Sequence, residues 1–244
     1  MSRRPEPSNL LSRLKIHNNN QKRQMNMKIK KLQLAVMAAA LAGAMNADAQ
    51  VTLTFDGVNP YEIVTLQVGS PINFGPGGVY AGIYNQTIDE VATPSFCIDV
   101  SRNISDGQTF TDYNYTNLSL APLTPAGPMG SATAADVEKL WAAYYPDASV
   151  TNQDAAALQV AIWEDIASHV GYTLTVSGND AVTTEAAAML ANLPNLNVEA
   201  NLVGLVSPDG QNYVVAVPEP TTADCFLLGL GVLACSRRFR QNRP

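Results

Sequence analysis

The two ends of this chain confine its folded domain to the sequence between them. Each end carries an apolar run close to a basic cluster: the first run spans 32–45 and the second spans 225–235. This combination is typical of a segment that is inserted into a membrane rather than one that packs into a core. We therefore expect the fold to lie within residues 50–217, a stretch long enough for one domain with its own core.

The N-terminal segment has the three parts of a secretory signal peptide. A basic stretch at 28–31 precedes the apolar run, and small residues lead up to Ala49, after which a signal peptidase would cut. Residues 1–26 are polar and basic without apolar periodicity, so Met27 is the better physical start. We interpret residues 1–49 as a leader with a signal peptide, and Gln50 as the first residue of the mature protein.

The C-terminal segment, residues 218–244, consists of Pro218-Glu219-Pro220, a short apolar run and an arginine cluster. The run is shorter than the ~20 residues of an ordinary spanning helix, which suits a segment held only briefly in a bilayer. The arginines would hold its end on the cytoplasmic side. The alternative is a buried or amphipathic C-terminal helix capped by proline.

This order of parts resembles the PEP-CTERM sorting signal of Gram-negative bacteria. The resemblance implies that an exosortase-type enzyme cuts at the Pro-Glu-Pro element and removes the tail. It also implies export through the inner membrane, transient membrane anchoring by the C-terminal segment, and release to the cell surface or extracellular matrix.

The region between the ends is strongly acidic. Residues 50–217 hold seventeen of the chain's 21 Asp and Glu residues, but only Arg102 and Lys139 as basic ones, which gives a net charge of −15. Such a surface repels nucleic-acid phosphates and anionic membranes, and we exclude both as partners. The stretch 99–107 has Ile104 where a calcium loop needs its turn glycine, so we expect no metal and no cofactor.

The first half of this region shows the alternation of strands, and the second half shows helical periodicity. We predict strands at 51–55, 61–68, 79–84 and 95–100, with a turn at 75–78 and a loop at 121–130. We predict three helices: one capped by Thr133 and ending before Pro146, one capped by Thr151 or Asn152 over about 154–169, and one over 184–193. A hairpin of 202–206 with 213–217 closes the domain. This order predicts an α+β domain, a β sandwich or barrel with an inserted helical lobe.

Two residues in this region call for an explanation. Cys97 is its only cysteine, because Cys225 and Cys235 would leave with the tail, so no internal disulfide can form. Gln159 lies on the apolar stripe of its helix, where a carboxamide must find partners or cost free energy. A thioester between Cys97 Sγ and Gln159 Cδ would remove both the thiol and the amide.

The residues around both positions resemble the bacterial thioester domains of surface adhesins. The two motifs are Phe96-Cys97-Ile98-Asp99 and Leu158-Gln159-Val160-Ala161-Ile162-Trp163-Glu164. The resemblance implies that Cys97 supplies the sulfur and Gln159 the acyl group, with Trp163 and Ile162 as the packing wall that excludes water. The family usually has threonine directly before the glutamine, whereas this chain has Leu158.

Three functions fit these patterns. The first is an exported adhesin that attaches covalently, in a single turnover rather than as an enzyme, to surface protein amines or extracellular polysaccharide. The second is a non-reactive structural or binding protein of the exopolysaccharide matrix. The third is a cysteine hydrolase that uses Cys97 and His169, although His169 is more typical of a histidine at a helix C-terminus. We interpret Glu164 and Asp165 as solvated helix charges.

Overall fold

The computed structural model describes residues 50–123 and 127–217. The predicted signal peptide with Ala49, and the tail with Pro218, Glu219 and Pro220, lie outside the described residues. Within the described part of the chain, no helix combines the length and the apolar character needed to cross a membrane.

One antiparallel sheet of seven strands forms the first layer. Its order is β2-β3-β9-β8-β4-β1-β7, and β1 also pairs with β2, so six of the strands follow one another in a continuous ring of hydrogen-bonded neighbours. The strands are β1 (Val51–Val68), β2 (Phe74–Ile88), β3 (Val91–Cys97), β4 (Thr109–Asn117), β7 (Leu174–Ser177), β8 (Leu202–Val206) and β9 (Tyr213–Ala216). The loop between β4 and the first helix contains a short 3₁₀ turn (Leu118–Leu120) and the small pair β5 (Pro122–Leu123) and β6 (Gly127–Pro128).

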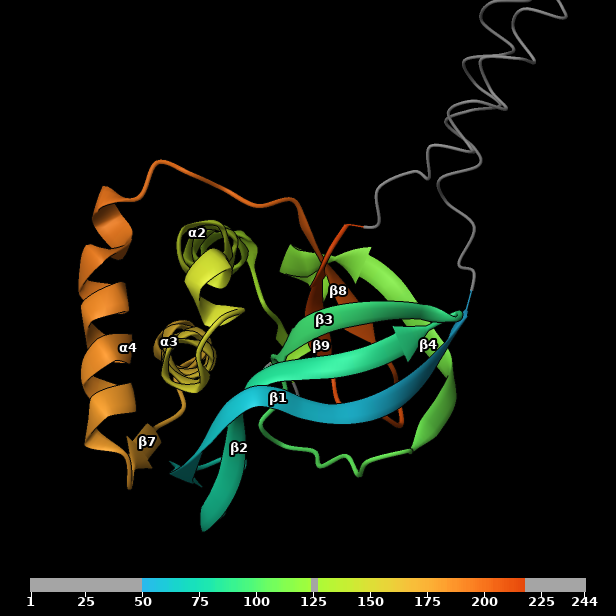
Figure 1. Ribbon diagram of the computed structural model, residues 1–244, viewed down its shortest axis with the longest axis horizontal. Helices are drawn as coiled ribbons and strands as arrows, with labels where there is room; N and C mark the ends of the chain where they lie inside the picture. The colour runs from blue at the N-terminus through green and yellow to red at the C-terminus, as the bar shows by residue number, and fades with distance from the viewer. Residues whose placement is uncertain (1–49, 124–126, 218–244) are drawn as a thin grey trace, which may run out of the picture. The chain divides into compact units, whose positions relative to one another are not determined.

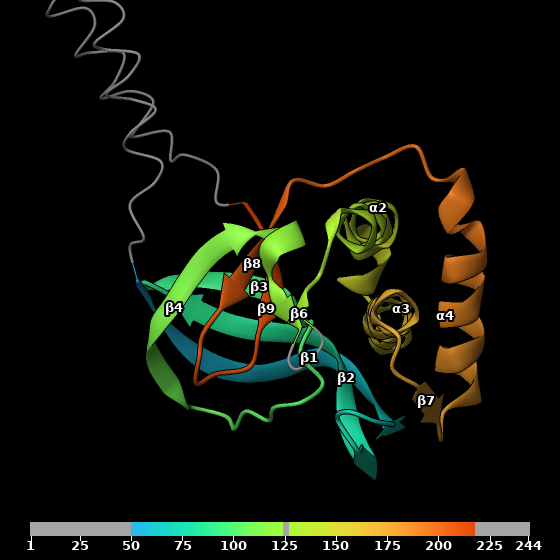
Figure 2. The same ribbon diagram turned by 180° about the vertical axis from the view of Figure 1, so that it is seen from behind.

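Three helices form the second layer, on one side of the ring. They are α2 (Ser131–Ala148), α3 (Asn152–Val170) and α4 (Asp180–Asn192), the last followed by a 3₁₀ turn (Leu193–Asn195). Figure 1 shows α2 and α3 end-on and α4 running across them at the outer edge, and Figure 2 gives the reverse view. The predicted α+β class is confirmed, while the finer choice of a sandwich or a barrel stays a prediction.

Helix α3 is the central element of the second layer, because it packs against α2, α4, β1 and β2. Every residue from 155 to 163 is buried, not only one face. Four of these nine residues are alanines, whose small side chains let neighbouring elements approach closely. The Thr151 hydroxyl caps the helix by accepting from the Asp154 amide at 3.0 Å, as predicted, and Gly171 ends it in the left-handed conformation.

Several boundaries in the strand-rich half differ from the prediction. The predicted strands 51–55 and 61–68 are one long strand, β1, with register shifts between 55 and 61. The segment 75–78 belongs to β2, and the turn lies at 69–73 instead. Gly82 of β2 faces this irregular part of β1, where a Cβ would collide with the Pro60 carbonyl oxygen. Strands β4 and β7 were not predicted.

The helical half follows the prediction more closely. The closing hairpin is confirmed as β8 and β9, and the third helix is confirmed but begins at Asp180. The boundaries predicted for α2 are wrong: the helix begins at Ser131 after Gly130, with Thr133 buried inside it, and Pro146 lies within its last turns. Pro146, which has no backbone N–H to donate, lies two residues before the helix ends at Ala148.

Candidate functional site

Cys97 is the last residue of β3, at a point where the sheet opens on one side. The pairing of β3 with β2 ends at Ser95 and Tyr84, whereas the pairing with β9 continues to Cys97 and Tyr213. The backbone of Cys97 therefore has a strand on one side only. On the other side, α3 supplies the missing partner from a position 62 residues further along the chain.

The carboxamide of Gln159 takes the place of that missing strand. The Cys97 backbone N–H donates to Gln159 Oε1 at 2.8 Å, and Gln159 Nε2 donates to the Cys97 carbonyl oxygen at 2.9 Å. Both residues have no exposed surface. This pairing satisfies four polar groups at once and explains how a glutamine can lie on the apolar face of α3. The structure thus brings Cys97 and Gln159 together, and Gln159 needs no covalent bond to be satisfied.

The sulfur of Cys97 has its own polar surroundings. Its thiol donates to the Asp99 carbonyl oxygen at 3.3 Å, and Gln211 Nε2 donates to the sulfur at 2.9 Å. Burial, and then the nearby charge of Asp99, raise the pKa of the thiol to about 12, although the hydrogen bonds with the Asp99 backbone and with Gln211 lower this pKa in part. Cys97 is therefore a protonated thiol at neutral pH.

Gln211 is a site residue that sequence reasoning missed. Besides the sulfur, its Nε2 donates to the carbonyl oxygens of Asp99 and Arg102, both at 3.1 Å. Its Oε1 accepts from the Tyr213 hydroxyl at 3.1 Å, and its own carbonyl accepts from the Tyr113 hydroxyl at 2.6 Å. No local pattern marks Gln211, because its neighbours read as a loop before a strand. Its amide group is held in a fixed direction by these contacts.

An ion pair between the half-buried Arg102 and the buried Asp99 lies in the loop that follows Cys97. Arg102 Nε lies 3.7 Å from Asp99 Oδ2, and Arg102 Nη1 donates to the carbonyl oxygens of Ser207 and Gly210 at 3.1 and 2.7 Å. The Asp99 side chain is almost fully buried and also accepts from the Ser101 amide at 3.0 Å. The loops that flank the sulfur, after β3 and before β9, are therefore connected to each other.

A cavity of about 310 Å³ extends from Cys97. Trp163 and Gln211 line it beside Cys97, and Tyr80 and Asp106 line it where the protein is exposed to solvent. The indole N–H of Trp163 is buried and makes no hydrogen bond within the described residues. The cavity therefore extends from exposed residues to the buried Cys97, which forms part of its lining.

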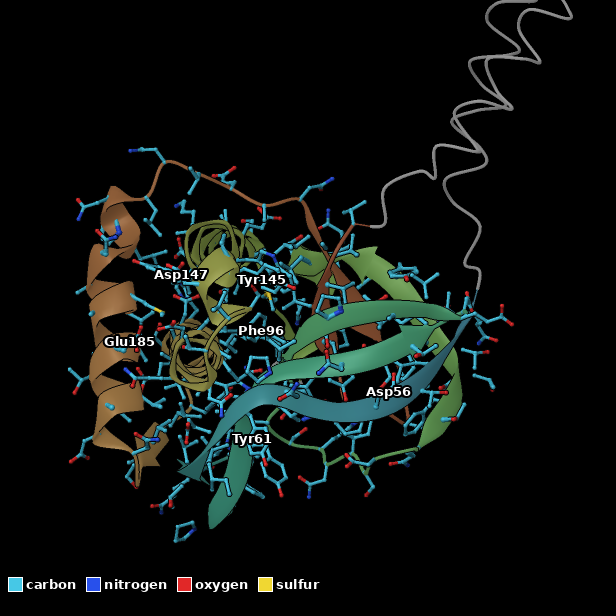
Figure 3. The ribbon with its side chains drawn as sticks, in the orientation of Figure 1. Asp56, Tyr61, Phe96, Tyr145, Asp147 and Glu185 are labelled. Carbon is cyan, nitrogen blue, oxygen red and sulfur yellow. The ribbon has the colours of Figure 1, made fainter. Side chains whose placement is uncertain are left out.

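The two residues predicted to form a packing wall lie in different places. Trp163, four residues after Gln159, lines the cavity together with Cys97. Ile162 is fully buried in the core and does not line the cavity. Phe96 does not line the cavity either, and its ring packs against α2, with centroid distances of 5.2 Å to Trp141 and 6.3 Å to Tyr145. Figure 3 labels Phe96 and Tyr145.

His169 belongs to a second cluster, between α2 and α3. Its Nδ1 lies 3.0 Å from the Asp165 carbonyl oxygen, its Nε2 lies 3.9 Å from Asp136 Oδ2, and it does not line the cavity at Cys97. Asp136, Asp165 and His169 could together hold a metal ion by residue type and proximity, although Lys139 Nζ already lies 3.3 Å from Asp136 Oδ1. Sequence reasoning did not group these residues.

The interpretation of Asp165 as a solvated charge is wrong. Only 5% of its surface is exposed, because α3 is covered on nearly all sides. Burial raises the pKa of this carboxyl to about 6, against the opposing effect of His169. Its neighbour Glu164 is half-buried, and burial also raises the pKa of its carboxyl.

No protein-family model matches the chain, and no curated protein matches it in sequence. The case for a function therefore comes from the residues and geometry of this site.

Proposed function

We propose that this protein is an exported surface or matrix protein that attaches covalently to its partner through a Cys97–Gln159 thioester. The observation that carries the proposal is the pair of hydrogen bonds, 2.8 and 2.9 Å long, between the Gln159 carboxamide and the backbone of Cys97. They hold the acyl carbon beside the one residue of the mature region that carries a thiol. The ring of six strands would serve as a rigid barrel that fixes Cys97 against α3.

Thioester formation would use only these two side chains. Cys97 Sγ bonds to Gln159 Cδ, the Cδ–Nε2 bond breaks, and the nitrogen leaves as ammonia together with the thiol proton. The site is buried at both residues, which protects the product from water until a nucleophile enters. Trp163 supports this role because its side chain is buried and lines the same cavity as Cys97.

The thioester would then react once with an amine of a surface protein or of extracellular polysaccharide. The amine nitrogen bonds to Cδ, the Cδ–Sγ bond breaks, and the departing sulfur takes the proton that the amine releases. Gln211 Nε2, at 2.9 Å from the sulfur, is placed to donate to the thiolate as it forms. This is a single attachment and not turnover.

Delivery to the outside forms part of the proposal. A signal peptidase would cut after Ala49, the C-terminal segment would hold the protein briefly in the inner membrane, and an exosortase-type enzyme would cut at Pro218-Glu219-Pro220. The acidic, nearly cation-free mature region suits a soluble exported surface. Peptide mapping of the extracellular form should find Gln50 at its start, and recovery of 237–244 from that form would exclude the sorting step.

Intact mass spectrometry tests the covalent function. Read against the termini found by peptide mapping, the fresh, unheated protein should be lighter than its sequence by one ammonia. Methylamine should add its full mass and expose one reactive thiol. Cys97→Ala and Gln159→Ala should each abolish the mass deficit and the methylamine adduct, since the bond needs both side chains.

The second candidate is a non-reactive structural or binding protein of the extracellular matrix. Two observations favour it: both polar atoms of the Gln159 carboxamide already have a hydrogen-bond partner, and the pKa of the Cys97 thiol is raised to about 12. Full sequence mass in the fresh protein, with no methylamine adduct, would select this function over the first.

A further inference from the structure

The cavity beside Cys97 has a larger volume than an unbranched alkyl amine requires. Its volume of about 310 Å³ lies at the lower end of the range for pockets that enclose a small-molecule ligand. Its lining runs from the fully buried Cys97 to Tyr80 and Asp106 at the exposed end. The cavity therefore has enough volume for a group the size of a sugar ring, between its exposed end and Cys97.

Aromatic side chains form much of the lining. At the exposed end, Tyr61 of β1 and Tyr80 of β2 make an edge-to-face pair with ring centroids 4.8 Å apart. Tyr80 is 52% exposed, and Figure 3 labels Tyr61. Phe55, Tyr84 and Trp163 line the cavity further in. Aromatic rings present rigid apolar faces with low entropy cost. A pyranose ring has C–H groups on its faces that pack on such rings, while its hydroxyls stay in water.

The charges at the cavity favour a cationic partner. Arg102 is the only basic residue that lines the cavity in the described part of the chain, and it is engaged by two backbone carbonyls and Asp99. Asp106 is exposed and makes no ion pair with any described residue. The net charge of −15 over residues 50–217 adds a long-range field that attracts a polycation.

The site also selects for an amine of low basicity. No histidine lines the cavity among the residues that the structure describes, so there is no evident base to deprotonate an incoming ammonium. A lysine amine, with a pKa of ~10.4, is almost entirely protonated at neutral pH. An amine on a sugar ring loses its proton at lower pH, because the neighbouring ring oxygens withdraw electrons. A useful share of it is already nucleophilic.

We propose that the covalent partner of this site is an aminopolysaccharide, a polymer of hexosamine units with free amino groups. One sugar ring packs against Tyr61 and Tyr80 at the exposed end of the cavity and against the aromatic residues further in. Its neutral amine bonds to Gln159 Cδ and releases Cys97, which takes the proton of the amine, while protonated units nearby pair with Asp106. This inference rests on the proposed thioester.

The test compares amines against the full-length protein, with intact mass as the readout at pH 7. The probes are a glucosamine oligomer, the fully N-acetylated oligomer, an Nα-acetyl-lysine amide and methylamine. At equal amine concentration, the glucosamine oligomer should form its adduct at least about tenfold faster than the lysine derivative, and the N-acetylated oligomer should form none. Equal or faster reaction of the lysine derivative would overturn the proposal.

Two pairs of variants locate the preference in the cavity. Tyr80→Ala and Asp106→Asn should each lower the ratio of the oligomer rate to the methylamine rate by about tenfold. Tyr115→Ala and Asp147→Asn change exposed residues that do not line the cavity, and should leave that ratio as it is. If neither Tyr80→Ala nor Asp106→Asn lowers the ratio of the oligomer rate to the methylamine rate, the proposal is also overturned. Absence of the mass deficit and of any methylamine adduct would instead refute the thioester itself, and this inference with it.

Discussion

The paired hydrogen bonds of Gln159 predict a stability loss that can be measured without any covalent chemistry. In a Cys97→Ala background no thioester can form, but the backbone amide and carbonyl of residue 97 remain. Adding Gln159→Leu then leaves two fully buried backbone groups without their partners at 2.8 and 2.9 Å. Each such group costs about 1–3 kcal/mol, so the double variant should be about 2–6 kcal/mol less stable than Cys97→Ala alone.

Urea unfolding monitored by circular dichroism gives this difference directly, provided that the slope of the transition is unchanged. The chain offers a matched control in Gln86, which is 1% exposed and whose two polar side-chain atoms make no hydrogen bond among the described residues. Gln86→Leu should be neutral or stabilising, because it removes buried polar atoms that have no partner. A loss below about 1 kcal/mol for Gln159→Leu, or equal losses at both positions, would refute the strand-replacing role of Gln159.

Two further predictions concern Asp165 and Gln211. Burial raises the pKa of Asp165 to about 6, so ionising this carboxyl costs more free energy in the folded than in the unfolded protein. The stability that the protonated carboxyl contributes is fully present below pH ~4 and is lost as the pH rises through about 6. Asp165→Asn should therefore raise stability at pH 7 by up to about 3 kcal/mol and flatten the pH profile of urea unfolding between pH 4 and 6; an unchanged profile would contradict the burial argument. Gln211→Leu should keep the ammonia mass deficit but slow the methylamine reaction by about 10- to 100-fold, because the thiolate loses a donor at 2.9 Å; an unchanged rate in a correctly folded variant would exclude Gln211 from the reaction.

Local signals predicted the parts of the fold that depend on local chemistry. The cap at Thr151, the helix that follows it and the closing hairpin are all set by residues a few positions apart. The pairing of β4 with β1 and β8 depends on contacts between distant segments, and no local pattern in 109–117 predicts these neighbours. The boundary of α2 was also not predicted, because Pro146 lies inside the helix although a proline usually ends one.

The candidate site was predictable in part for the same reason. Cys97 and Gln159 stand out singly, as a lone thiol and as a carboxamide on an apolar stripe, and the motif around each allowed them to be paired. Gln211 approaches the sulfur only because β9 lies beside β3, a neighbour relation between segments more than a hundred residues apart. Asp165 looked like a surface charge because the sequence does not show that α3 is enclosed on nearly all sides.

The two proposed bond partners belong to different layers, Cys97 to the sheet and Gln159 to the enclosed helix α3. Before the reaction, a thioester would fasten the layers to each other. After it, the sheet would be released and the captured molecule would hang from α3 alone. A pulling force on that molecule would then be carried by the packing of α3 between β1, β2, α2 and α4, and not by any remaining covalent bond between the layers. The mechanical strength of the attachment would be set by how hard it is to draw one buried helix out of its place.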